Sequence, residues 1–409
     1  MGDVAMMQVA ARRLCELWPC ARIEAVTSAP HLLRAFCPAA VPAPFYEKAA
    51  WMASRDLCIC LRQSLPACLA CALFKCERTI WLRLPALADL ALWIKSVCLG
   101  RPFSPPAAFR SRLKSADILV VSGMGILNDP FAGSAISLLD EIEAALNAGL
   151  SVFAFGQGVG PITDPLLWRR ARAVLPRLAL ISLREGRTGL PLLRALGVPP
   201  EKILVTGDDA IELALEQKPS EPGNAIGVSL RLANYAGTDQ HTARSLAAPL
   251  QDAADALHAP LVPVPISFEK GESDIRSAEL LLGPHCREHC QNLACPQDVI
   301  RLIGSCRVVV TGAYHAGVFA LAQGIPVVGL IQSPYYEQKF KGLQQQFPEG
   351  CHLLDLRTPL SSAQIRDTVL AAAHSADHSR DSLLAAAARQ VELSRQAYRQ
   401  AASLYPLPQ

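Results

Sequence analysis

Apolar residues recur with helical spacing at the start of the chain and then change to a strand–helix alternation. Met7, Ala10, Leu14 and Leu17 follow a 3-4-3 spacing, which predicts an amphipathic helix. A strand over 22–27 and a helix starting near His31 are expected next. Residues 45–112 are apolar and rich in arginine without clear alternation, so we expect a helical insertion there.

From Ala116 onward, short apolar runs alternate with amphipathic helices. The expected strands are 117–121, 152–155, 178–182 and 203–206, followed in the second half by 225–230, 261–265, 308–311 and 326–331. Helices are expected at 135–146, 189–196, 364–373 and 381–404. Fully apolar strands separated by helices indicate parallel sheets covered on both faces, hence an α/β fold.

A polar segment, QKPSEPG at 217–223, interrupts this alternation and is typical of a linker. Because 409 residues exceed the roughly 250–300 that one core usually supports, two domains are expected. We predict a Rossmann-like lobe over 1–216 that contains the helical insertion, a second such lobe over 224–360, and closing helices over 361–409.

Composition narrows the classes of partner. The chain is 51% hydrophobic with a net charge of +3, which argues against disorder and against a general affinity for nucleic acid. We see no secretory signal, and the apolar run Leu65–Phe74 has about half the roughly 20 residues that a membrane span needs. We expect a cytoplasmic protein, with peripheral contact at the inner face of the membrane and a homo-oligomer as open alternatives.

Cysteines are numerous but do not form a clear site. Nine of the 14 precede residue 100, where buried thiols are a simpler interpretation than disulfides. The pair Cys68 and Cys71 lies within an apolar run, which disfavours redox chemistry. The segment 285–295 carries two histidines and three cysteines; a zinc site is the alternative there to a polar loop with incidental thiols.

Chemically distinctive residues follow several of the expected strands. In parallel α/β sheets, ligands gather at the carboxyl ends of strands, where glycine loops and helix N-termini accept anions. The candidates at these positions are Gly123, Gly125, Asn128, Gln157, Gly158, Arg184, Arg187, Asp208, Arg231, Tyr314 and His315. Each has a structural alternative: glycines serve tight turns, arginines pair with nearby acids, and an aspartate caps a helix.

Familiar nucleotide and hydrolase motifs are absent from the sequence. It contains no G-x-x-x-x-G-K-[ST] and no G-x-S-x-G, which disfavours a P-loop ATPase and a hydrolase with a nucleophile elbow. The glycines at 156, 158 and 160 have G-x-G-x-G spacing, which does not fit a dinucleotide site.

Taken in order, these segments resemble the polysaccharide pyruvyl transferase family. The resemblance rests on Gly2-Asp3 before a helix, VVSGMGILND, FGQGVGPI, ISLREGRTGLPLLRALGV, VTGDDA, GVSLR, VPVPISFEKGESD and VVVTGAYHAGVFALAQGIPVVGL. It implies two Rossmann-like lobes similar to GT-B-like glycosyltransferases and transfer of a pyruvyl group from phosphoenolpyruvate to a sugar as a ketal. The partners would be phosphoenolpyruvate and a glycan or lipid-linked sugar, with no cofactor and no metal.

The resemblance implies site residues and also shows two departures. His315 and Asp208 would be catalytic; Asp3, Gly123, Gly125, Asn128, Gln157, Gly158, Arg184, Arg187, Arg231, Tyr314 and Lys339 would bind substrate. The family often has an arginine where this chain has Ala313, so we expect Arg184, Arg187, Arg231 or Lys339 to replace its charge. The family's first strand before Gly2-Asp3 is also missing, which suggests that the natural chain starts earlier. The alternatives are a nucleotide-sugar glycosyltransferase and a non-catalytic partner in polysaccharide assembly.

Overall fold

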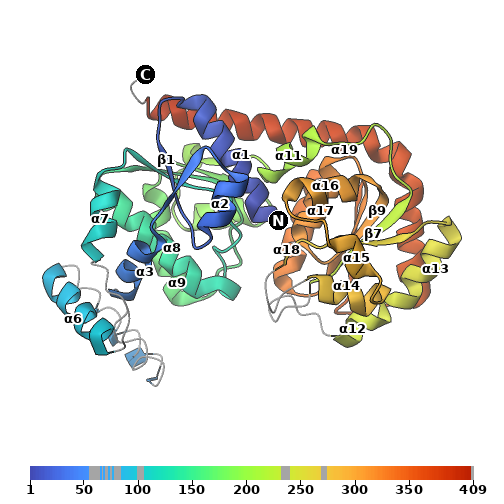
Figure 1. Cartoon of the computed structure of the whole chain (residues 1–409), viewed down its shortest axis with the longest axis horizontal. Coiled ribbons are helices and arrows are strands. Elements are labelled where there is room, and N and C mark those ends of the chain that lie inside the picture. Colours follow the sequence, from blue (N-terminus) through green and yellow to red (C-terminus); the bar gives the residue numbers. More distant parts are fainter. Residues whose placement is uncertain are drawn as a thin grey trace. The chain divides into compact units, whose positions relative to one another are not determined.

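The computed structural model describes residues 1–54, 65–66, 68–69, 72–73, 76–77, 84–98, 106–231, 240–268 and 274–406. These fall into two compact units (Figure 1). The larger unit comprises Met1–Pro19, Val120–Ile136 and Phe153–Gln409, and the smaller comprises Cys20–Leu119 and Ser137–Val152.

The first parallel sheet has the strand order β3-β4-β5-β6. Its strands are β3 (Ile118–Val121), β4 (Ser151–Gln157), β5 (Leu180–Leu183) and β6 (Ile203–Val205). β4 pairs with β5 in parallel, with Ala154 opposite Ile181, and Ser182 of β5 lies opposite Leu204 of β6. All four residues of β5 are buried, as expected for a strand covered on both faces.

The second sheet has five parallel strands in the order β11-β10-β9-β7-β8. They are β7 (Ala225–Ser229), β8 (Leu261–Pro263), β9 (Cys306–Thr311), β10 (Val327–Ile331) and β11 (Cys351–Asp355). Central strand β9 places Val309 opposite both Gly227 and Val327. The apolar residues Val308, Val309 and Val310 of β9 are fully buried between neighbouring strands and packed helices.

The helices of the larger unit cover these sheets. They are α1 (Gly2–Leu17), α9 (Pro165–Val174), α10 (Gly189–Ala195), α11 (Ala210–Glu216), α12 (Gln240–Ser245), α13 (Ala247–Leu257), α14 (Asp274–Leu282), α15 (Cys286–Cys290), α16 (Pro296–Gly304), α17 (Tyr314–Ala322), α18 (Pro334–Gln346) and α19 (Ser362–Leu404). Figure 1 shows α19, in red, as one long helix that runs past elements of both sheets. It contacts α11, α13, α17 and α1.

The smaller unit holds a two-stranded parallel sheet and several helices. Its elements are β1 (Ile23–Val26), α2 (Pro30–Phe36), β2 (Ala40–Ala43), α3 (Phe45–Ser54), α6 (Pro85–Cys98), α7 (Pro106–Lys114) and most of α8 (Ala132–Asn147). Arg112 joins Glu24 and Glu47 through ion pairs of 2.6 and 2.8 Å. Among the described helices, none is long and apolar enough to cross a membrane.

Two expectations need correction, and a third stays a prediction. The closing helices expected at 364–373 and 381–404 form the single helix α19, because residues 374–380 contain neither proline nor glycine to interrupt it. Strands β2 and β11 were not expected; β11 is short and only partly buried, so its apolar signal is weak. The strands of the two large sheets lie on either side of 217–223. The helix α11, just before this segment, packs on α17 and α19, and the two compact units divide at other positions. The expected lobe boundaries therefore stay a prediction.

Candidate active site

The carboxyl ends of strands from both large sheets bring a charged cluster together within the larger unit. Arg184 directly follows β5, and Asp208 lies three residues beyond the end of β6. His315 is the second residue of α17, just after β9. Arg184 and Asp208 follow neighbouring strands of one parallel sheet and therefore lie at the same edge, whereas His315 follows a strand of the other sheet and meets them through packing.

Arg184 is the most buried cation of this cluster, with 2% of its surface exposed. Its Nη1 lies 3.4 Å from Asp208 Oδ2, and its guanidinium carbon lies 4.4 Å from the centre of the Tyr314 ring. A Cβ at Gly125 would lie 2.4 Å from Arg184 Nη2, and one at Gly158 would lie 2.6 Å from it. Both glycines are therefore required by the close approach of this guanidinium to the backbone.

Asp208 connects Arg184 to the histidine. Its Oδ2 lies 3.6 Å from His315 Nε2, and its Oδ1 accepts a hydrogen bond of 2.9 Å from the Ala210 backbone N–H. Burial by itself would raise the pKa of Asp208, but His315, Arg184 and that N–H lower it below its ordinary value. Asp208 is therefore a carboxylate in the folded protein.

The His315 ring is held between α1 and its own helix. A Cβ on Gly2 would lie 2.0 Å from His315 Cγ, so only glycine fits at this first position of α1. The Tyr314 and His315 rings meet edge to face, with centroids 5.2 Å apart. His315 Nε2 and the Tyr314 hydroxyl are both buried without a hydrogen-bond partner among the described residues.

Lys339 extends from α18 into a group of tyrosine rings. Its Nζ lies 4.0 Å from the centre of the Tyr335 ring, 5.3 Å from that of Tyr314 and 5.6 Å from that of Tyr336. Burial is the main cause that lowers the pKa of Lys339 well below its ordinary value, and the positive charge of Arg184 adds to this effect. The binding of an anion here would favour the charged ammonium.

Arg231 is held in a separate, fully formed ion pair. Its Nε and Nη2 donate to the two carboxylate oxygens of Asp274 at 2.7 and 3.1 Å. Asp274 also accepts hydrogen bonds from the backbone N–H groups of Ile266 and Ser267. Arg231 nevertheless lies close enough to Lys339 to lower the pKa of that amine.

The other expected residues have more varied positions. Asp3 is exposed, and its charge acts on Arg184 and Lys339. Gln157 is fully buried and donates to the backbone carbonyls of Val121, Ser122 and Phe155, so it ties β3 to β4. Such contacts give Gln157 a structural role.

Two expected residues lie beside the cluster and one lies outside it. Asn128 donates to the Gly125 carbonyl at 2.7 Å and caps a short 3-10 helix through Phe131 N–H, so it shapes the loop under Arg184. A Cβ on Gly123 would lie 2.6 Å from Met6 Sδ, which indicates a packing role. Arg187 is exposed, and no contact described for it joins it to the cluster.

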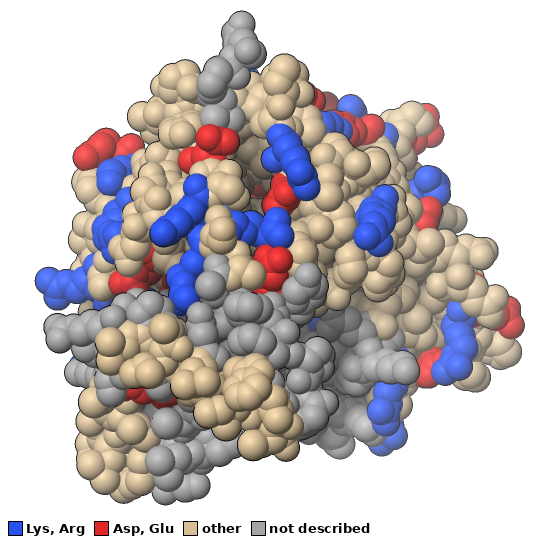
Figure 2. Space-filling view, turned by 60° about the vertical axis from the view of Figure 1, so that its left-hand side comes forward, with Lys and Arg blue, Asp and Glu red and all other residues tan. Residues whose placement is uncertain are grey.

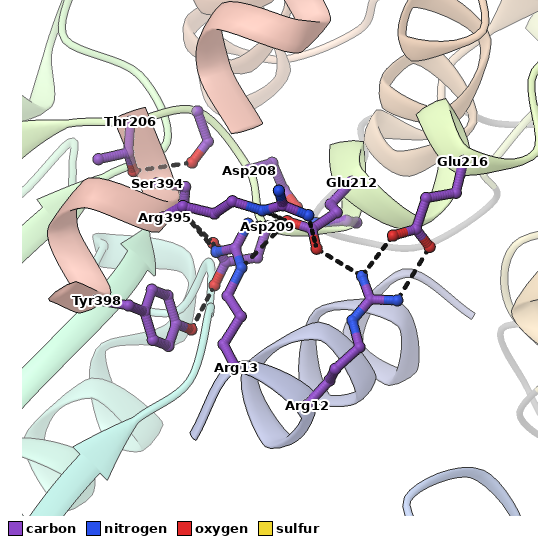
Figure 3. Close-up of polar contacts among 12 residues, drawn as sticks. Arg12, Arg13, Thr206, Asp208, Asp209, Glu212, Glu216, Ser394, Arg395 and Tyr398 are labelled. Atoms are coloured by element: carbon purple, nitrogen blue, oxygen red, sulfur yellow. Dashed lines mark hydrogen bonds and ion pairs between the residues drawn. The ribbon is translucent and has the colours of Figure 1, made fainter. Parts of the chain in front are cut away.

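A second network, which was not expected from the sequence, lies behind Asp208 (Figure 3). Arg13 of α1 donates to Asp209 at 3.0 Å and to Ser394 of α19 at 2.7 Å, and it also pairs with Glu212. Tyr398 donates to the other Asp209 oxygen at 2.8 Å. Arg13, Asp209, Glu212 and Tyr398 are each at most 3% exposed. In the sequence, this network is indicated only by the adjacent arginines Arg12 and Arg13 and by the adjacent acids Asp208 and Asp209.

No metal site is evident among the described residues, where no group of three or more His, Cys, Asp or Glu side chains could hold an ion. In the segment offered as a zinc alternative, Cys286 and Cys290 are buried free thiols. Burial raises the pKa of Cys290 to about 11, which disfavours the thiolate that zinc binds. Of the pair for which redox chemistry was disfavoured, Cys68 is exposed and Cys71 lies outside the described residues.

The fold is α/β with the GT-B-like architecture, so the expected fold class is confirmed. S. aureus MnaA in its UDP co-structure matches with a TM-score of 0.56 and 12% identity, covering 100% of this chain and 95% of that chain. A UDP-glucosyltransferase from Polygonum tinctorium matches with a TM-score of 0.52 and 13% identity, covering 98% and 96%. TcCGT1 in complex with UDP matches at 0.53 and 12%, covering 98% and 96%.

Within this class, the family is defined by the sequence. The family model for polysaccharide pyruvyl transferase matches residues 1–334, and the chain belongs to that family. It is therefore a transferase of polysaccharide pyruvylation. No curated protein matches the chain.

Proposed function

We propose that this protein transfers the pyruvyl group of phosphoenolpyruvate to a pair of hydroxyls on a glycan or lipid-linked sugar, forming a cyclic ketal. The observation that carries the proposal is the buried Tyr314 hydroxyl, which has no hydrogen-bond partner among the described residues and lies beside the cations Arg184 and Lys339 and the His315–Asp208 pair. Buried polar groups without partners are uncommon and fit a site completed by a ligand.

The donor has the charge that this cluster would accept. Phosphoenolpyruvate carries a phosphate and a carboxylate, and such groups favour arginine, lysine and helix N-termini. Arg184 and Lys339 supply the cations, and the nine-residue helix α17 begins beside them. The charge missing at Ala313 is thereby replaced by residues from β5 and α18.

The overall reaction balances without a cofactor. C3 of the donor gains a proton and becomes a methyl group, while C2 loses its bond to the phosphate oxygen and forms two bonds to sugar oxygens. Of the two hydroxyl protons released, one balances the proton placed on C3 and the other leaves on the phosphate. Two proton transfers are therefore needed at the site.

We assign these transfers to His315. Histidine is suited to both directions of transfer near neutral pH, so one ring can donate to C3 and then accept a hydroxyl proton. Asp208, ionised and 3.6 Å from Nε2, would stabilise the charged imidazolium. The Gly2 backbone packs against the ring and restricts its orientation.

A ligand panel tests the class of donor. Phosphoenolpyruvate should raise the thermal unfolding temperature in proportion to the logarithm of its concentration. UDP-sugars and GDP-sugars are the rival donors, because UDP occupies the co-structure of the similar S. aureus MnaA fold. Stabilisation by a nucleotide sugar but not by phosphoenolpyruvate would overturn the proposal in favour of a glycosyltransferase.

His315→Gln tests the assigned role. Loss of general acid–base help should lower the rate of phosphate release in the presence of acceptor by about 10²–10⁴-fold. His378→Gln is the matched control, since His378 is exposed on α19. If folded His315→Gln keeps more than about a tenth of the wild-type rate, the histidine has a structural role only.

The cation assignment is tested by direct binding. Lys339→Ala should weaken phosphoenolpyruvate binding about tenfold or more, as expected for loss of a charge-assisted contact. Exposed Arg187, which the structure does not join to the cluster, provides the comparison variant Arg187→Ala. Equal affinity in Lys339→Ala and wild type would remove Lys339 from the donor site.

A further inference from the structure

The helix α6 of the smaller unit exposes an apolar face. Leu87, Leu90, Ile94 and Val97 follow a 3-4-3 spacing, which places them on one side of a helix. They are 50%, 51%, 49% and 60% exposed. Trp93, beside this row, is 48% exposed. Single exposed apolar residues are ordinary, whereas a continuous row of them indicates an interaction surface.

Positive charge is concentrated in the same part of the chain. Residues 45–114 contain 11 lysines and arginines against 4 acids, a net charge of +7. The rest of the chain contains 28 against 32, a net charge of −4. The segment that exposes the apolar helix face is therefore basic within a protein that is otherwise slightly acidic.

Figure 2 shows part of the described surface beside the grey residues. In that view, the described surface at the lower left, beside the grey residues, is mostly tan. Higher on this face, basic and acidic side chains are interspersed. An apolar area next to a basic segment has the chemistry of a membrane-binding surface.

We propose that α6 lies in the plane of an anionic lipid bilayer and inserts its Leu87–Val97 face among the acyl chains. Its 14 residues give a length of about 21 Å, enough to lie along an interface, and the described helices include none that could span one. Anionic lipid matches the excess of +7, and a tryptophan beside the apolar row suits the boundary between headgroups and acyl chains. This contact is independent of the donor chemistry and would bring the enzyme to a lipid-linked acceptor.

Vesicle co-sedimentation tests the proposal. The full chain should bind vesicles of phosphatidylcholine and phosphatidylglycerol at 70:30, a composition chosen at roughly physiological anionic content. Binding should be weaker to pure phosphatidylcholine and should fall as salt is raised, because screening shortens electrostatic attraction. Leu90→Glu with Ile94→Glu should lower partitioning about tenfold or more, since each buried aliphatic side chain contributes at least that factor.

The matched control is Leu393→Glu, because Leu393 is 45% exposed on α19, outside the smaller unit. It should bind vesicles like the wild type. Transfer to a soluble acceptor should be unchanged in the α6 variant. Vesicle binding is measured without any donor, so a failed donor assignment would not affect the binding test. Equal vesicle binding by the α6 variant and the wild type overturns the proposal. A loss of self-association in the α6 variant, measured by light scattering, without a change in vesicle binding would assign the face to a second copy of the chain and also overturn it.

Discussion

Replacement of Arg13 by leucine would remove the cation that lies between two buried carboxylates. Arg13 Nη1 is 3.0 Å from Asp209 Oδ1, its Nε is 3.2 Å from Glu212 Oε2, and only 3% of its surface is exposed. Leucine keeps much of the apolar stem but no charge. The variant would therefore leave Asp209 without its ion-pair partner inside the protein.

The size of the effect follows from this burial. Breaking a buried ion pair by removal of one partner typically costs about 3–5 kcal/mol, because the remaining charge stays desolvated. Arg12, the preceding residue, makes similar contacts with Glu212 and Glu216, but its side chain is 37% exposed. Pairs that are this solvated contribute about 0–1 kcal/mol, so Arg12→Leu is the matched control.

The loss of stability in Arg13→Leu should increase as the pH rises. Burial is the main cause that raises the pKa of Asp209 above its ordinary value, and Arg13 acts against this rise. In Arg13→Leu the folded-state pKa of Asp209 should rise further, so the folded state binds more protons than the unfolded chain over a wider pH range. An acid of raised folded pKa destabilises the protein increasingly as pH rises, so the loss should be larger at pH 8 than at pH 5.

Glu212 should also make the loss of stability in Arg13→Leu larger at high pH than at low pH. Burial alone would raise its pKa, but hydrogen bonds and charges of Arg395, Arg13 and Arg12 lower the pKa of Glu212 to about 2. This lowered pKa contributes stability that is present above its ordinary value of 4.5 and is lost as pH falls toward 2. Removing Arg13 reduces that contribution mainly at neutral and alkaline pH.

Urea unfolding followed by circular dichroism at pH 5 and pH 8 measures both effects. We expect Arg13→Leu to lose about 3–5 kcal/mol at pH 8 and less at pH 5, while Arg12→Leu loses at most about 1 kcal/mol. Adding Asp209→Leu to Arg13→Leu should restore part of the loss, because the unpaired carboxylate is removed. A loss below about 1 kcal/mol in Arg13→Leu, or a larger loss at pH 5 than at pH 8, would refute the reasoning.

Two further predictions concern packing and thiol chemistry. Gly2→Ala places a Cβ 2.0 Å from His315 Cγ and should lower transfer at least about tenfold through a displaced ring, whereas Gly133→Ala, with no neighbour within 4 Å, should leave the rate unchanged. Equal rates in the two variants would show that the ring does not need this contact. Burial raises the pKa of Cys306 to about 12, so mass spectrometry after iodoacetamide treatment at pH 8 should find exposed Cys20 modified and Cys306 intact until the protein unfolds. Modification of both at similar rates in the folded protein would contradict the burial.

Most strands could be predicted from the sequence because parallel sheets require uninterrupted apolar runs. The run Cys306–Thr311 is buried from both sides, and its composition alone indicates a central strand. Cys351–Asp355 lies at the sheet edge and is only partly buried, so its polar ends weaken the signal. The other edge strands, β3, β6 and β8, were predicted because their short apolar runs stand between clear helical patterns.

The candidate site could be predicted in outline for a related reason. Arg184, Asp208 and His315 each follow a strand within a few residues, and the carboxyl ends of parallel strands are where ligands bind in such sheets. That His315, from the second sheet, meets the other two depends on packing between the sheets. Lys339 lies on α18, away from any strand end; its position was implied only by the family resemblance. The three tyrosine rings around it come together through the packing of two helices, which the hydrophobic pattern of the sequence does not predict.

The adjacent carboxylates Asp208 and Asp209 show why the second network could not be found in the sequence. The two residues share a loop, but Asp208 faces Arg184 and His315 while Asp209 faces Arg13 and the C-terminal helix. Their environments act in opposite directions: nearby positive charges lower the pKa of Asp208, and burial raises that of Asp209 despite its arginine. Contacts between residues nearly 200 positions apart cause this difference, so identical neighbours in the sequence acquire different chemistry. One aspartate belongs to the candidate active site, and the other fixes the loop that carries it to helices from both ends of the chain.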